Sequence, residues 1–168
     1  MKKILLNLVL AVMTISCSQA QKTEFEPATL KSEMVSTDKS TTVFQRVIDQ
    51  NRGKIIVIDV WATWCPDCIK GFRKSEDLKR QFPDVQYVYI SMDRNFESWT
   101  EGIQKYKLDG QHYWIPEGMK GVFGKSIDLN WIPRYIVVDK NGRIAQYNSI
   151  EADDTKMTTV LNELQNRK

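Results

Sequence analysis

Cysteine and histidine are scarce in this chain, which has three cysteines and one histidine among its 168 residues. A structural zinc site requires four ligands, and most of these are cysteine or histidine side chains. Beyond the pair Cys65 and Cys68, the chain offers only Cys17, in an apolar N-terminal segment, and His112. The sequence therefore gives no support to a metal site, and we expect none.

The chain also contains no glycine-rich loop of the nucleotide-binding kind and no excess of charge of one sign. Lysine and arginine number 24 against 21 aspartates and glutamates. Lys2 and Lys3 are the only charges among the first twenty residues, so the remainder carries 22 basic residues against 21 acidic ones. We expect no cofactor, and such a balanced charge gives no support to nucleic-acid binding.

The apolar run Ile4–Met13 is too short to span a bilayer as a helix. Because two lysines precede it, the run is typical of an export signal, which we place at residues 1–20. Two processing routes stay open: cleavage after Ala20, or lipidation of Cys17 with a lipoprotein signal that ends before it. We expect an extracytoplasmic protein of the bacterial periplasm or cell envelope, held at a membrane if Cys17 carries a lipid anchor.

The rest of the chain divides into two parts by composition. Residues 21–40 are rich in Gln, Lys, Thr, Ser and Glu and have few large apolar side chains, which is typical of a flexible tether. Residues 41–168 have close to the commonest length of a domain and can bury a core. We expect one folded domain without internal repeats, and a monomer.

Apolar periodicity predicts helices interleaved with strands in this domain. In the first half we expect a helix from about residue 43 that stops before Gly53, a strand at 55–61, a helix through the cysteine pair that stops at Pro83, and a strand at 85–92. A helix at 93–107, a short strand at 112–115 and a weak helical turn at 118–125 follow. The last elements are a hairpin of 135–138 with 143–147 and an amphipathic helix at 151–167. This order indicates an α/β fold with a central sheet covered on both faces.

The cysteine pair stands where the apolar strand 55–61 meets the start of a helix. In the first helical turn the thiol of Cys65 faces unpaired backbone N–H groups and the positive end of the helix dipole, which favour its thiolate. Pro66 and Asp67 lie at this helix start, where proline needs no N–H. Cys68 lies on the same helical face, so a disulfide can close. The setting predicts thiol–disulfide exchange, and a purely structural disulfide is the alternative.

The segment 57–68, with the sequence VIDVWATWCPDC, resembles the active-site segment of the thioredoxin superfamily. A second segment, WIPRYIVVDKNGRI around Pro133, resembles the cis-proline strand of that family and the hairpin after it. The resemblance covers roughly residues 40–168 and implies a thioredoxin-like three-layer fold, with a central mixed β-sheet flanked by helices. It also implies a cis bond before Pro133, and a substrate strand bound by Pro133, Ile132 and Trp64.

Asp59 is an acid inside the apolar strand, six residues before Cys65. Because a buried carboxylate is costly, we expect Asp59 to be shielded, partly protonated or in contact with water. Its position matches the buried acid of thioredoxins. The resemblance implies that Asp59 takes the proton of Cys68, so that Cys68 can attack a mixed disulfide. The alternative is an acid at a strand end that hydrogen bonds hold in place.

Two residues beside the expected cis-proline depart from the family pattern, in which smaller or neutral residues are commoner. The indole of Trp131 would narrow the substrate groove, and the guanidinium of Arg134 would favour the thiolate if it lay near Cys65. Simple packing of Trp131 and a solvated strand end for Arg134 are the alternatives.

Within the superfamily, the sequence looks closest to the TlpA/ResA-like extracytoplasmic thiol–disulfide oxidoreductases, although the N-terminal hairpin common in that branch is not obvious in it. This resemblance implies a protein-disulfide reductase that acts on extracytoplasmic protein substrates and receives electrons from a membrane thiol donor. The dipeptide Pro66-Asp67 does not decide the direction, so a disulfide oxidase or isomerase stays open. A thioredoxin-like binding or holdase module with an incidental disulfide is the other alternative.

Overall fold

The structure of the protein is a computed structural model that describes residues 22–167. The expected signal peptide at residues 1–20, and Cys17 within it, lie outside this range and stay predictions. No helix among residues 22–167 is both long enough and apolar enough to cross a membrane.

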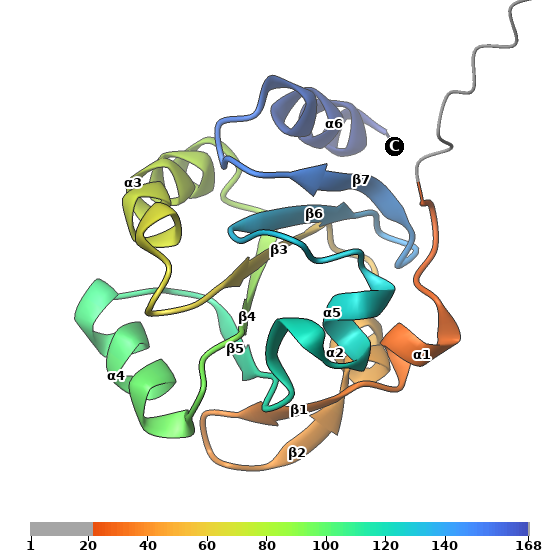
Figure 1. Ribbon diagram of the computed structural model, residues 1–168. Coiled ribbons are helices and arrows are strands. Elements are labelled where there is room, and N and C mark those ends of the chain that lie inside the picture. Colours follow the sequence, from red (N-terminus) through yellow and green to blue (C-terminus); the bar gives the residue numbers. More distant parts are fainter. Residues whose placement is uncertain (1–21, 168) are drawn as a thin grey trace, which may run out of the picture.

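A seven-stranded mixed sheet forms the centre of the molecule (Figure 1). Its strands are β1 (Glu33–Ser36), β2 (Thr41–Val43), β3 (Ile56–Trp61), β4 (Gln86–Ser91), β5 (Gln111–Trp114), β6 (Arg134–Val138) and β7 (Ile144–Ser149). They lie in the order β2-β1-β5-β4-β3-β6-β7. Strands β3, β4 and β5 pair in parallel, and the other pairs are antiparallel. Every residue of β3 and β6 is buried, as expected for strands covered on both faces.

Helices cover both faces of this sheet (Figure 1). They are α1 (Pro27–Leu30), α2 (Phe44–Gln50), α3 (Pro66–Gln81), α4 (Phe96–Tyr106), α5 (Val122–Ser126) and α6 (Thr155–Asn166), with a 3₁₀ turn η1 at Gly118–Lys120. On one face, Trp61 at the end of β3 packs edge-on against Phe72 of α3, with 5.4 Å between ring centroids. On the other, Phe44 of α2 packs against Phe123 of α5 at 5.2 Å. The predicted α/β fold with a mixed sheet flanked by helices is confirmed.

Residues 22–40 are not a flexible tether, contrary to the expectation from their composition. They include α1 and β1, and β1 pairs with both β2 and β5, so it lies within the sheet. Met34 is fully buried, and the ring of Phe25 lies 4.8 Å from that of Phe44. Composition misses this arrangement because backbone hydrogen bonds on both edges, which need no particular side chains, hold the strand. Strands β1 and β2 form the N-terminal hairpin that was not obvious in the sequence.

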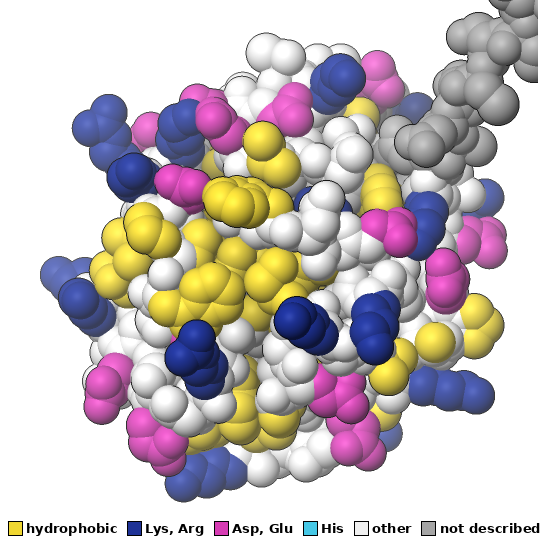
Figure 2. All heavy atoms as spheres, in the orientation of Figure 1, with side chains coloured by type: hydrophobic (Ala, Val, Ile, Leu, Met, Phe, Trp, Pro, Cys, Tyr) yellow, Lys and Arg dark blue, Asp and Glu magenta, His cyan; other side chains and the backbone are white. Residues whose placement is uncertain are grey.

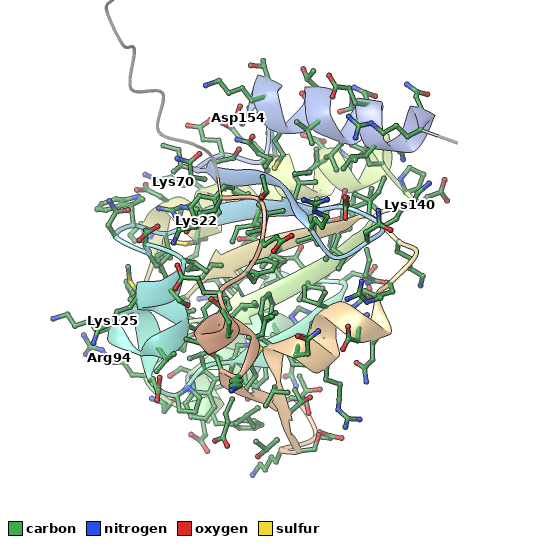
Figure 3. The ribbon with its side chains drawn as sticks, turned by 90° about the vertical axis from the view of Figure 1, so that its right-hand side faces the viewer. Lys22, Lys70, Arg94, Lys125, Lys140 and Asp154 are labelled. Atoms are coloured by element: carbon green, nitrogen blue, oxygen red, sulfur yellow. A yellow bond between two sulfur atoms is a disulfide. The ribbon has the colours of Figure 1, made fainter. Side chains whose placement is uncertain are left out.

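The first described residues are also tied to the domain (Figure 3 labels Lys22). Nζ of Lys22 lies 2.8 Å from the carboxylate of Asp128 and donates a hydrogen bond of 2.9 Å to the carbonyl of Ser126. The backbone N–H of Ile144 donates to the carbonyl of Thr23 at 2.9 Å. The segment before α1 therefore packs against β7 and against the loop after α5.

Candidate active site

The loop that carries the cysteine pair leads from the end of β3 to the start of α3. Helix α3 begins at Pro66, and Cys65 is its N-cap residue. Asp67 lies in the first turn, where the carboxylate interacts favourably with the positive end of the helix dipole. The sequence thus sets the helix start inside the pair, which leaves Cys65 in extended backbone and Cys68 in the helix.

Cys65 and Cys68 form a disulfide, with 5.3 Å between their Cα atoms. The backbone N–H of Cys68 donates a hydrogen bond of 3.1 Å to Sγ of Cys65. An amide donor at this distance stabilises negative charge on sulfur, so the same contact favours the Cys65 thiolate once the disulfide is reduced. Cys65 is 4% exposed and Cys68 is 1% exposed, so Cys65 is the more accessible residue of the two.

The Ile132–Pro133 peptide bond is cis and lies against the disulfide. The carbonyl oxygen of Ile132 is 3.4 Å from Sγ of Cys65, although the two residues are 67 positions apart. Strand pairing explains this approach, because β6 begins directly after Pro133 and Arg134 stands opposite Val60 of β3. The antiparallel register between β3 and β6 therefore places the cis-proline loop beside the cysteine pair.

A groove of about 360 Å³ opens beside the cis-proline loop. Trp131 and Ile150, two of its walls, are 58% and 55% exposed, and Trp64 next to Cys65 is 49% exposed. Figure 2 shows hydrophobic side chains gathered on the face that Figure 1 presents, with charged side chains around them. The groove is lined by Asp67, Lys70, Gly71, Lys74, Trp131, Pro133, Tyr135, Ile150 and Glu151. Trp131 is therefore not a packed core residue, since its indole forms part of an open surface.

Asp59 lies in the middle of β3, and it is only 3% exposed. Neither of its carboxylate oxygens has a hydrogen-bond partner of good geometry among the described residues, and the hydroxyl groups of Tyr135 and Ser75 are close enough only to act on its pKa. Burial raises the pKa of Asp59 to about 7, although Tyr135, Lys79 and Ser75 lessen this rise. Tyr135 stands opposite Asp59 in the strand register, and its hydroxyl lies 3.1 Å from that of Ser75. Asp59 thus changes protonation near neutral pH.

Arg134 is buried and is not a solvated strand end. Its guanidinium donates hydrogen bonds to the carbonyl of Ile127 at 3.3 Å and to Oδ1 of Asn130 at 3.0 Å. Both acceptors belong to the loop that precedes the cis-proline. The interactions of Arg134 therefore hold this loop in place, and none of its hydrogen bonds within the described part of the chain goes to the Cys65 sulfur.

Sequence reasoning missed a second buried acid near the pair, Asp93, which is 1% exposed. Its carboxylate accepts hydrogen bonds from Thr63, two residues before Cys65. One signal was present in the sequence, because Asp93 follows an apolar strand. That strand, β4, is the parallel neighbour of β3, so the loops after the two strands leave the sheet at the same edge. An acid after a strand is so common in loops that this position alone does not point to the site.

Comparison with known proteins agrees with this geometry. A family model described as thioredoxin-like matches residues 53–144. The solved structure of a candidate thiol-disulfide oxidoreductase from Bacteroides vulgatus is similar, with 28% identity, a TM-score of 0.68, and coverage of 83% of this chain and 90% of that one. A secreted disulfide oxidoreductase of Mycobacterium tuberculosis, homologous to E. coli DsbE, shares the fold at 16% identity and a TM-score of 0.62, with coverage of 83% and 100%.

Curated relatives match over a shorter segment. A thioredoxin from Geodia cydonium is 31% identical over 65 residues, which are 39% of this chain and 61% of that protein. The chain thus spans less than two thirds of the length of the curated relatives that it matches. The family match at residues 53–144 covers more than half of the chain and includes both the cysteine pair and the cis-proline, and the chain therefore belongs to the thioredoxin-like family.

Proposed function

We propose that this chain is an exported thiol–disulfide oxidoreductase that reduces disulfides in extracytoplasmic proteins. The observation that carries the proposal is the place of the Cys65–Cys68 disulfide, at the start of α3 and 3.4 Å from the carbonyl of Ile132 beside the cis-proline. A crosslink between residues three apart constrains the unfolded chain very little, so stabilisation alone is a weak reason for it. The position of the Cys65–Cys68 disulfide instead favours thiol–disulfide exchange with another protein.

Cys65 is the proposed nucleophile. In the reduced protein its thiolate attacks one sulfur of the substrate disulfide, a mixed disulfide forms, and the other substrate sulfur leaves as a thiolate. Support comes from the N–H of Cys68, which lies 3.1 Å from the Cys65 sulfur at the positive end of the α3 dipole. Both features favour the thiolate over the thiol.

Cys68 is proposed to complete the reaction. Its thiolate attacks the Cys65 sulfur of the mixed disulfide, the Cys65–Cys68 bond forms, and the bond from Cys65 to the substrate breaks, so that the second substrate sulfur leaves as a thiolate. Over both steps the dithiol loses two electrons and the substrate disulfide gains them. Cys68 must first lose its proton in a buried setting, and we assign Asp59 as the acceptor. A carboxyl group whose pKa burial raises to about 7 can take a proton at neutral pH and return it to solvent.

Substrate binding is assigned to the cis-proline loop and to the apolar surface beside it. Ile132 and Pro133 would pair with an extended substrate segment, and Trp64 would cover the segment next to its cysteine. In the groove, Lys74 lies 2.5 Å from Glu151, and Lys70 lies 3.7 Å from Asp67, so the charges along the groove occur in opposite pairs. Recognition would then rest on apolar contact more than on net charge.

The reductase direction rests on the resemblance to the TlpA/ResA-like branch, and the β1–β2 hairpin is consistent with that branch. An exported reductase needs a source of electrons outside the cytoplasm, and we assign this part to a membrane thiol donor. Lipidation of Cys17, if it occurs, would hold the domain near such a donor. We expect the protein to act as a monomer.

The direction can be tested by the equilibrium reduction potential of the Cys65–Cys68 pair. We expect a value near or below about −250 mV, in the range of thioredoxin, when the domain is titrated against a dithiothreitol or glutathione buffer. A value nearer about −120 mV is that of a strong oxidant and would overturn the reductase direction. If the reduced Cys65–Cys68 pair cannot reduce any protein disulfide, the result would favour the alternative of a thioredoxin-like binding module with an incidental disulfide.

The groove assignment can be tested by replacing Trp131 with alanine. Because the indole is an exposed wall of the groove, we expect KM for a protein disulfide substrate to rise about fivefold. The reaction with a small aromatic disulfide should stay unchanged, since it needs no groove. Val122→Ala is a matched control, because Val122 is 48% exposed but does not line the groove. Equal losses with both substrates would argue against the assignment.

A further inference from the structure

Asp93 is a buried acid that the proposed mechanism does not use. It follows β4, and its carboxylate accepts the backbone N–H of Thr63 at 3.0 Å and the Thr63 hydroxyl at 2.5 Å. The hydroxyl of Ser91 donates to the same carboxylate at 2.8 Å. These three donors satisfy the carboxylate of Asp93, which is 1% exposed, and thereby make its burial tolerable.

The loop that carries Asp93 is itself fixed. The indole N–H of Trp114 donates to the backbone carbonyl of Asp93 at 2.8 Å, and the N–H of Asp93 donates to the hydroxyl of Ser91 at 3.0 Å. Strands β3 and β4 are parallel neighbours with Trp61 opposite Ser91, so Asp93 leaves the sheet beside Thr63. Asp93 is therefore fixed in position, and its hydrogen bonds to Thr63 fix the turn that follows β3.

Helix α4 holds the same threonine from another direction. A Cβ atom added to Gly102 of α4 would lie 2.4 Å from the methyl group of Thr63 and 3.1 Å from the Trp61 ring. Only glycine leaves room for the methyl group at this place. Thr63 is thus held through its amide and hydroxyl by Asp93 and through its methyl group by α4.

We propose that Asp93 is a positioning residue for the cysteine pair, which acts through Thr63 to keep the Cys65 sulfur against the N–H of Cys68 and the carbonyl of Ile132. The turn is short: the N–H of Cys65 donates to the carbonyl of Ala62 at 3.1 Å, so a displacement of Thr63 carries Cys65 with it. The inference rests on the proposed function in one respect, namely that the Cys65 thiolate is the reacting group.

The sharpest test replaces Thr63 with valine, which has the same shape but no hydroxyl donor. We expect the pKa of the Cys65 thiol to rise and its alkylation by iodoacetamide at pH 7 to slow about tenfold. The reason is that the Cys65 thiolate is no longer held against the N–H of Cys68. Thr63→Ser keeps the hydroxyl and should retain most of the wild-type rate. All three proteins contain the same acidic residues around the turn, so a change in the number of acids does not account for a difference.

A purely structural role of the network predicts another outcome. Ile48→Val is the control, since it weakens the core in α2, where Ile48 is 2% exposed, without touching the turn. If Thr63→Val lowers Tm as Ile48→Val does but leaves the alkylation profile of Cys65 unchanged, the inference is wrong. Should Thr63→Val not fold, Ser91→Ala removes a different donor to Asp93 and should shift the profile in the same direction, and an unshifted profile overturns the inference.

This experiment separates the two proposals. Alkylation needs no protein substrate, so it reports on the position of Cys65 whether or not the chain reduces protein disulfides. A wild-type protein without reductase activity would refute the proposed function, and the alkylation profiles would still decide the part that Asp93 plays.

Discussion

Replacement of Cys65 by serine is expected to abolish the reduction of protein disulfides. A hydroxyl group does not attack disulfides at neutral pH, whereas a thiolate does, so activity should fall to the rate without protein. The assay is the turnover of a protein disulfide with a chemical dithiol as the electron source. Cys17→Ser in the full chain is the matched control, because Cys17 is the only cysteine outside the pair, and it should leave the rate unchanged.

The partner substitution, Cys68→Ser, should give a different result in the same assay. The first attack by Cys65 still occurs, but no second thiol can release the substrate, so the mixed disulfide accumulates and is visible as a covalent complex on a non-reducing gel. Accumulation with Cys65→Ser in place of Cys68→Ser would mean that the two cysteines have been assigned in the wrong order.

Asp59→Asn is expected to change how stability depends on pH. The pKa of Asp59 is about 7 in the folded protein against the model-compound value of 3.8, so between these values the unfolded chain ionises while the folded one stays protonated. The free energy of unfolding of the wild type should therefore fall as pH rises from about 4 to about 7 and then level off. From pH 5 to pH 8 this loss is on the order of 2 to 3 kcal/mol, and asparagine removes it.

Urea denaturation of both oxidised proteins at pH 5 and pH 8 measures this difference. The other titrating groups are common to both proteins, so their effects cancel in the comparison. Parallel pH dependence in the two proteins would mean that Asp59 ionises in the folded state as easily as in water.

The same substitution tests the proton-transfer role. Asparagine cannot accept a proton, so release of the substrate from the mixed disulfide should slow about a hundredfold near pH 7, while the first attack by Cys65 keeps its rate. Stopped-flow measurement of the two steps distinguishes them. Equal slowing of both steps would indicate a general disturbance of the site instead of a lost proton acceptor.

Local patterns in the sequence predicted much of the fold because they depend on neighbours along the chain. The apolar run before Cys65 and the proline after it set a strand and a helix start, and the structure has both, with β3 at Ile56–Trp61 and α3 from Pro66. The turn between β6 and β7 likewise follows from Asp139 and from Gly142, which has a φ of 79°. Such features need only backbone preference and apolar periodicity.

The errors and omissions share one cause, which is pairing between distant segments. Composition suggested a tether at residues 21–40, but β1 is held there by hydrogen bonds to β2 and β5. For Arg134 the sequence left open a guanidinium near Cys65 or a solvated strand end. Arg134 does begin β6, but it is buried, and its guanidinium binds the loop at Ile127 and Asn130. Neither fact can be read from the neighbours of these residues in the sequence.

By itself, the sequence determined the chemistry of this protein: a dithiol at a helix start, with an acid buried six residues earlier, because residue types and their spacing fix which groups can react. Only the tertiary structure decided how that chemistry is held. The register of β3 with β6 places Ile132 3.4 Å from the Cys65 sulfur, and the neighbouring strand β4 delivers Asp93 to Thr63. These contacts arise between chain segments that meet only when the sheet forms, since strand pairing, and not sequence distance, sets which residues become neighbours.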